Sequence, residues 1–169
     1  TDFVALTHLP SDGMKMYQKY TVKYTNNVYE GDNCTIYNVP ITELAKYAMK
    51  SITAGVGVWF VADVHQSYNW MHSTLDDKMD DSKAVFGETY KFEKGDRILM
   101  RNVQGTHAMT LTGFNVDHNG VPVSWQVENS WGYVDQETPG MDGFLTMSHT
   151  WFVKYVTEVV VHSNFLSRT

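Results

Sequence analysis

Short stretches in which apolar and polar residues alternate recur along the chain, and this is the pattern of half-buried β-strands. Seven stretches show the alternation or a short apolar run: residues 16–25, 35–37, 56–64, 107–114, 121–128, 143–147 and 155–162. The run 56–64 is almost continuously apolar, which predicts a central strand buried on both faces. The pattern therefore favours a sheet of many short strands.

One segment has the period of a helix instead. Its apolar residues recur at the spacing of one helix face: Ile41, Leu44, Ala45, Ala48 and Ile52. Pro40 suits the first turn, where its missing N–H costs nothing, and Gly55 is a natural stop. We expect one main helix that packs its apolar face against the sheet.

The segment Asp117-His118-Asn119-Gly120 lies between two of the strand-like runs and predicts a hairpin, because Asn-Gly favours positive φ at a turn. An antiparallel, barrel-like sheet with one main helix is an α+β fold. No repeat or linker divides the chain, so we expect a single domain over residues 1–169. Residues 65–95 are expected to be mostly loop with a binding or assembly role, and 148–152 a short capped turn. Residues 97–103 are ambiguous.

Composition narrows the function classes. Of the 169 residues, 43% are apolar and 19% charged, which is typical of a globular chain, and the net charge of -6 argues against nucleic-acid binding. The acidic run 76–81 is expected to be a solvated loop. No apolar run has membrane-spanning length and no leader is visible. The single cysteine excludes an intrachain disulfide and fits a reducing, cytoplasmic setting.

His107 and Asn129 are the candidate chemical pair. Each lies eleven residues from position 118, so a hairpin centred there places them side by side on antiparallel strands. An Asn carbonyl that accepts from an imidazole N–H fixes the ring and leaves the other nitrogen for a nucleophile. Trp131 is expected to shield that hydrogen bond from water. Taken singly, His107 is better explained as a surface or satisfied core histidine, and ordinary core packing also explains Trp131.

Longer motifs around this pair resemble one family. The segments that carry the resemblance are Val58–Val64, Thr106–Gly113, Trp125–Gly132, Gly143–Phe152 and Tyr155–Val161. Together they are similar to the bleomycin hydrolase and aminopeptidase C family, a branch of the papain-like cysteine peptidases. The resemblance runs from about residue 2 to residue 166 and is carried most specifically by Trp-Gln-Val-Glu-Asn-Ser-Trp-Gly at 125–132.

The resemblance implies that the chain is the C-terminal, barrel-like lobe of a papain-like fold, with the nucleophilic Cys on an N-terminal helical lobe upstream. His107 is then the general base, Asn129 orients it, and Trp131 supports both. The family also implies peptide substrates, removal of N-terminal residues, hydrolysis of amide drugs such as bleomycin, and a hexamer. The isolated chain is expected to be inactive, because it lacks the family's nucleophile.

Two features depart from the family pattern. Cys34 follows Gly31-Asp32-Asn33 beside a predicted strand, whereas the family's nucleophile begins a helix between a Gln and an aromatic residue, so we reject Cys34 as nucleophile. The family usually continues into a C-terminal arm that limits cleavage to N-terminal residues. Here the sequence ends at Ser167-Arg168-Thr169, which leaves aminopeptidase restriction open.

Two other readings compete with the peptidase. The chain could be a stand-alone binding or assembly module derived from the barrel lobe, although the presence of both His107 and Asn129 argues against this. It could also be a metal protein, since it has seven histidines. No His-Glu-x-x-His pair and no cluster with structural-zinc spacing supports that reading, so we expect no metal and no cofactor.

Overall fold

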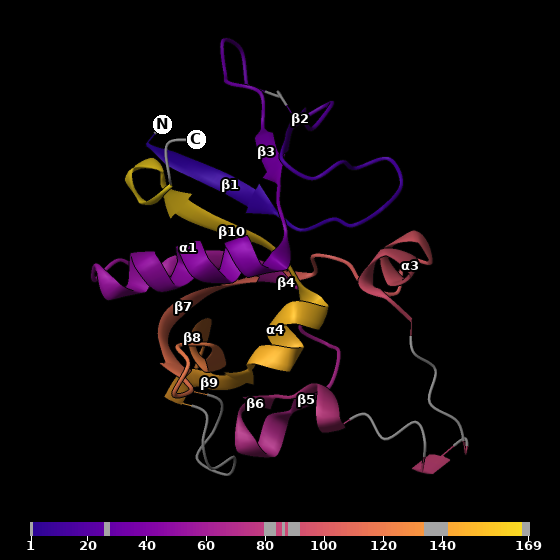
Figure 1. The fold of residues 1–169 in the computed structure, drawn as a ribbon, viewed down its shortest axis with the longest axis vertical. Coiled ribbons are helices and arrows are strands. Elements are labelled where there is room, and N and C mark those ends of the chain that lie inside the picture. The colour runs from indigo at the N-terminus through magenta and orange to yellow at the C-terminus, as the bar shows by residue number, and fades with distance from the viewer. Residues whose placement is uncertain are drawn as a thin grey trace.

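A ten-stranded mixed sheet organises the molecule in the computed structural model, which describes residues 2–25, 28–79, 84, 85, 87, 92–133 and 142–166 (Figure 1). The strands are β1 Phe3–Thr7, β2 Gln18–Thr21, β3 Thr35–Asn38, β4 Val58–Ala62, β5 Tyr68–Asn69, β6 Thr74–Leu75, β7 His107–Val116, β8 Pro122–Tyr133, β9 Asp142–Ser148 and β10 Val156–His162. Their spatial order is β2-β3-β1-β10-β4-β7-β8-β9-β6-β5. The pairings are antiparallel except β1 with β3 and β6 with β9.

The described helices include two that pack against this sheet, those at 41–53 and 149–155. The helices are α1 Ile41–Thr53, α3 Lys94–Leu99 and α4 His149–Tyr155, with short 3-10 turns at Trp70–His72, Asp77–Met79 and Ser163–Phe165. Figure 1 shows α1 lying across β10 and β4, with α4 below it near β9. Among the residues that the structure describes, none of these helices is both long and apolar enough to cross a membrane.

The main helix forms where its apolar spacing predicts it. Pro40 is its N-cap residue, and the helix ends just before Gly55, which has a φ of +80°. Leu44, Ala45 and Ala48 are buried and face the sheet. The core that they share with the strands and α4 is filled by large side chains: Phe60, Trp125, Trp151, Phe152 and Tyr155.

Most of the predicted strands are confirmed, with changes at their ends. The run 16–25 is a strand only over Gln18–Thr21, because Tyr17 and Tyr24 adopt positive φ, and Thr35–Tyr37 extends by one residue. The segment 56–64 shortens to Val58–Ala62, whereas the two hairpin strands lengthen to Val116 and Tyr133.

Other segments differ from the expectation. The sequence pattern missed β1, which pairs with β10 on one edge and with β3 on the other. The ambiguous region 97–103 contains the end of α3, and the expected capped turn at 148–152 is the start of α4. The segment 65–95, expected as loop, holds β5, β6 and two 3-10 turns, although residues 80–83, 86 and 88–91 lie outside the described part.

The acidic run is not simply solvated. The Asp76 carboxylate accepts from the Ser148 hydroxyl at 3.2 Å, and Asp77 accepts from Thr150. Both carboxylates therefore lie at the N-terminus of α4, where negative charge is favourable. The rest of the run, together with the chain end 167–169, falls outside the described residues.

Candidate active site

On the β7–β8 hairpin, one row of side chains faces the core, and His107 and Asn129 lie at the end of this row. Strand alternation points their side chains to the same face as Met109 and Val127, which are buried. The Asp117 turn closes the hairpin: its carboxylate accepts from the backbone N–H groups of Asn119 and Val121 at 2.8 and 2.9 Å. A fixed turn and a buried row therefore set where the two polar side chains lie.

The two side chains are hydrogen-bonded, as the hairpin predicts. His107 Nε2 lies 2.9 Å from Asn129 Oδ1. An amide oxygen can only accept, so Nε2 carries the proton and Nδ1 of the neutral ring keeps a free lone pair. Asn129 is only 8% exposed, and this bond satisfies its carbonyl in a setting where an unpaired polar group is costly.

The observed β7–β8 pairing differs from the symmetric hairpin about residue 118 that the sequence predicts. Thr110 pairs with Glu128, and continuing that register places His107 opposite Trp131 rather than opposite Asn129. Irregularities between Leu111 and Gly113 and between Asn115 and Val116 shift the pairing. His107 and Asn129 are therefore diagonal neighbours on one face, which imidazole and amide side chains can still bridge.

Aromatic rings cover the histidine. The rings of Trp131 and His107 stack with centroids 4.8 Å apart at 26°, and the Tyr68 ring centroid lies 6.3 Å from that of Trp131. Trp131 is 36% exposed, so it forms the outer layer over the imidazole. Burial raises the pKa of Tyr68 to about 12, and its phenol therefore stays neutral across the physiological range. The expected position of Trp131 beside the pair agrees with this geometry.

The segment before His107 is also anchored, and sequence reasoning did not identify the residue that holds it. Asp63 follows β4 and is 6% exposed, with its carboxylate directed at residues 104 and 106. The signal that could have identified Asp63 was a charged residue at the end of the apolar run 56–64. Tyr68 gave no comparable signal, because its contact with Trp131 depends on the fold.

The other candidate residues lie elsewhere. Cys34 is exposed and precedes β3, and the strands β1, β10 and β4 separate β3 from β7. His149 is structural: its Nδ1 accepts from the Trp125 indole at 3.2 Å, and burial lowers its pKa. Within the described residues, no group of three or more His, Cys, Asp or Glu side chains is arranged to hold a metal ion.

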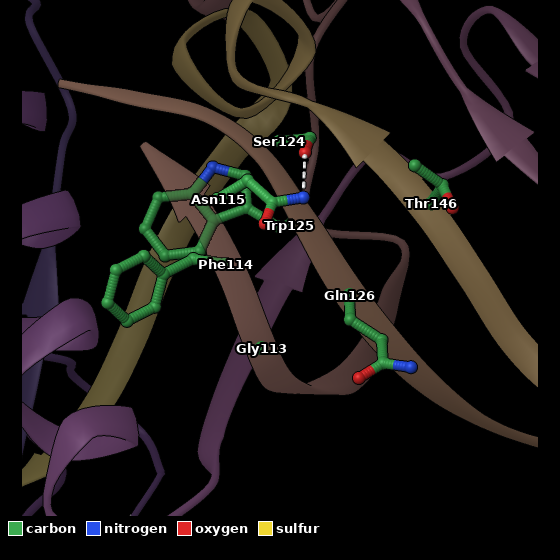
Figure 2. A pocket seen from close by; sticks show the side chains of 7 residues that line it. All are labelled: Gly113, Phe114, Asn115, Ser124, Trp125, Gln126 and Thr146. Atoms are coloured by element: carbon green, nitrogen blue, oxygen red, sulfur yellow. Dashed lines mark hydrogen bonds between the residues drawn. The ribbon is translucent and has the colours of Figure 1, made fainter. Parts of the chain in front are cut away.

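The two hollows described on the surface are not lined by His107. One of them, of about 330 Å³, lies on the β7–β8–β9 face, where Asn115 Nδ2 donates to Ser124 Oγ at 3.3 Å (Figure 2). Its lining is Gly113, Phe114, Asn115, Ser124, Trp125, Gln126 and Thr146. None of these residues is charged or can act as a general base for the hydroxyls of Ser124 and Thr146, so the hairpin end with His107 remains the candidate site.

Known proteins resemble this chain along almost its whole length. Residues 1–169 match a family described as the peptidase C1-like family. The human protein named bleomycin hydrolase is 37% identical over 163 residues, which cover 95% of this chain and 35% of that protein. Aminopeptidase G of Lactobacillus delbrueckii subsp. lactis is 34% identical, covering 99% of this chain and 37% of the relative. The chain thus spans about a third of the length of these relatives.

A solved structure gives the same picture. The crystal structure of PepW from Lactobacillus rhamnosis HN001 superposes with a TM-score of 0.90 at 31% sequence identity. The match covers 98% of this chain and 36% of that one. The α+β architecture is therefore that of a papain-like C-terminal lobe, as the sequence resemblance implied.

Proposed function

Because the chain belongs to the peptidase C1-like family, we propose that it supplies the general base and the orienting amide of a cysteine-type peptidase. His107 is the base and Asn129 orients it. The observation that carries the proposal is the 2.9 Å bond from His107 Nε2 to Asn129 Oδ1, which leaves Nδ1 free to accept a proton. The only cysteine of these 169 residues is remote from the pair, so the nucleophile belongs to another part of the protein.

The geometry supports a simple sequence of proton transfers. His107 Nδ1 takes the proton of a cysteine thiol, giving a thiolate and an imidazolium. The thiolate attacks the carbonyl carbon of the substrate amide, and the imidazolium then protonates the departing amine as the C–N bond breaks. Water hydrolyses the resulting thioester after losing a proton to His107. Asn129 holds the ring through both transfers, and Trp131 limits water around their hydrogen bond.

The names of the relatives suggest the finer features of this proposal. Aminopeptidase and bleomycin hydrolase are the names of the proteins at 34% and 37% identity, so the substrates we infer are peptides with a free N-terminus and similar amides. The proposal includes a Cys-bearing helical lobe as the partner of this chain, a homo-oligomer of the kind that the family implies, and a cytoplasmic location. Without the helical lobe, the isolated chain is expected to be inactive.

The test uses the longest natural form of the protein and a fluorogenic amino-acid amide. His107→Ala is expected to lower kcat/KM by at least about 10³-fold, because no other group takes the thiol proton. Asn129→Ala is expected to cost about 10²-fold, since the base is kept but loses its orientation. Blocking the substrate's amino group by acetylation is expected to abolish turnover if the enzyme is an aminopeptidase.

His118→Ala is the matched control. His118 is an exposed histidine at the tip of the same hairpin, and its ring contacts only the neighbouring Asn119 amide at 3.0 Å among the described hydrogen bonds. This variant is expected to keep full turnover. If His107→Ala retains wild-type turnover, the assignment of the base is wrong.

A further inference from the structure

A buried carboxylate lies beside the strand end that carries His107, and the proposed chemistry does not use it. Asp63 directly follows β4, whose last residue, Ala62, pairs with His107. It is 6% exposed, and within the described part of the chain it forms no ion pair. A buried carboxylate without a counter-charge is costly unless hydrogen bonds satisfy it. Its donors therefore show what the residue holds in place.

Two of the three donors belong to the segment that leads into His107. Asp63 Oδ2 accepts from the backbone N–H of Gln104 at 3.4 Å. Asp63 Oδ1 lies 3.5 Å from the Thr106 hydroxyl, whose single proton it shares with the Ala62 carbonyl at 3.3 Å. The third donor is Gln66 Nε2, at 3.4 Å from Oδ2. One carboxylate thus ties residues 104 and 106 to the end of β4.

Further contacts hold the same segment. The Thr106 N–H donates to the Ala62 carbonyl at 3.1 Å, and the Thr106 hydroxyl accepts from the Val64 N–H at 3.3 Å. Gly105 lies so close to β4 that an added Cβ would be 2.6 Å from Val61 Cγ1. The backbone segment that precedes His107 therefore packs closely against β4 and is held there by hydrogen bonds.

We propose that Asp63 is a positioning residue, which holds the 104–106 segment and through it keeps the His107 ring in register with Asn129. The inference rests on the proposed role of His107 as general base. Two contacts then set the position and orientation of the His107 ring. Asn129 holds the ring at Nε2, and Asp63 holds the backbone segment that leads into His107. A displacement of about 1 Å in a reacting group costs on the order of 10²-fold in rate, so loss of either contact slows catalysis.

The kinetic test compares Asp63→Ala and Asp63→Asn in the longest natural form of the protein. Asp63→Ala is expected to lower kcat by about 10- to 100-fold with little change in KM, at a temperature where the variant remains folded. Asp63→Asn is expected to recover part of the lost kcat, because its amide oxygen can still accept a hydrogen bond from one of the two donors in the 104–106 segment. A rise in KM with unchanged kcat would contradict the proposal.

A double variant separates positioning from a merely structural role. Asp63 and Asn129 act on one ring, so the loss in Asp63→Ala/Asn129→Ala is expected to be smaller than the product of the two single losses. Glu158→Gln is the matched control, since Glu158 is a partly buried carboxylate that pairs with Val61 in the same sheet and makes no described hydrogen bond to residues 104–106. It is expected to keep wild-type kcat. If the loss of kcat in the double variant equals the product of the two single losses, the inference is overturned.

A second readout does not depend on activity. In the ¹⁵N-histidine-labelled protein, the His107 Nε2–H proton is expected to exchange slowly with water, and at least about tenfold faster in Asp63→Ala. Glu158→Gln leaves the exchange rate unchanged. An exchange rate that Asp63→Ala does not alter would refute the positioning role. If the wild-type protein hydrolyses no amide, the proposed function fails, and the exchange measurement still decides the role of Asp63.

Discussion

Lys94 and His8 form an unusual pair of basic groups away from the candidate site. The Lys94 ammonium donates to the backbone carbonyls of Val153, at 3.3 Å, and Val156, at the C-terminal end of α4. Burial lowers the pKa of Lys94 to about 7. Burial, and then the nearby charge of Lys94, lower the pKa of His8 to about 4. The charge of Lys94 therefore favours the neutral form of His8.

Lys94→Met is expected to raise the pKa of His8, because it removes a positive charge but leaves the burial of the imidazole nearly intact. The pKa should rise from about 4 but stay below the ordinary 6.5, since burial is the larger cause. An NMR titration of the His8 Cε1–H resonance measures it. An unchanged His8 pKa would show that the two groups are not coupled.

Lys94 also gives stability a pH dependence. Its pKa of about 7 in the folded protein lies below the ordinary 10.5, so between these pH values the unfolded chain binds more protons. The free energy of unfolding therefore rises with pH across this window, by an amount on the order of 4 kcal/mol from this group. Urea titrations at pH 6.5 and 9.5 test this, and the rise should be smaller in Lys94→Met. An equal rise in both proteins would contradict the account.

At the scale of elements, local signals in the sequence located the main helix and the hairpin. Pro40 and Gly55 bound α1, and Gly120 has a φ of +78° at the turn that Asn-Gly predicts. These features depend on neighbouring residues, so the sequence is sufficient to find them. β1 and α3 were missed because β1 is defined by distant partners and α3 is only six residues long.

The candidate site was predictable only in part. The contact between His107 and Asn129 follows from two strands joined by a short turn. Its diagonal geometry depends on irregularities in the β7–β8 pairing that no single residue type announces. Asp63 lies more than 40 residues in the chain from its donors in the 104–106 segment, and its role emerges only when β4 and that segment meet.

The cap of α4 is a testable element. Ser148 Oγ accepts from the Trp151 N–H at 3.2 Å and also donates to Asp76. Ser148→Ala is expected to lower the free energy of unfolding by about 1–2 kcal/mol, because it removes the cap and leaves Asp76 with one donor fewer. Ser124→Ala, which removes only a surface bond to Asn115, is the control. Equal stability of the two variants in urea would count against the cap.

For the whole molecule, the sheet leaves apolar side chains in water. Pairing aligns Trp59, Thr110, Glu128 and Phe144 across four strands, and Trp59 and Phe144 are 44% and 43% exposed. A separate hollow of about 640 Å³ lies among β1, β3 and α1. Exposed apolar surface of this kind is typical of faces that contact another chain or lobe.

The isolated 169-residue chain is therefore expected to self-associate or to bind a helical partner. Sedimentation velocity at increasing concentration measures this, and Trp59→Ser with Phe144→Ser is expected to reduce association if this row forms the contact. A monodisperse monomer at high concentration would contradict the expectation.

The central claim is that His107 activates a thiol that lies outside these residues. The most direct measurement is the rate of iodoacetamide labelling between pH 5 and 8 in the longest natural form of the protein, with the labelled cysteine identified by mass spectrometry. The account predicts that a cysteine outside residues 1–169 is labelled rapidly at low pH. This rapid phase should be lost in His107→Ala. Slow labelling at Cys34 alone, or a rapid phase that His107→Ala leaves unchanged, would contradict it.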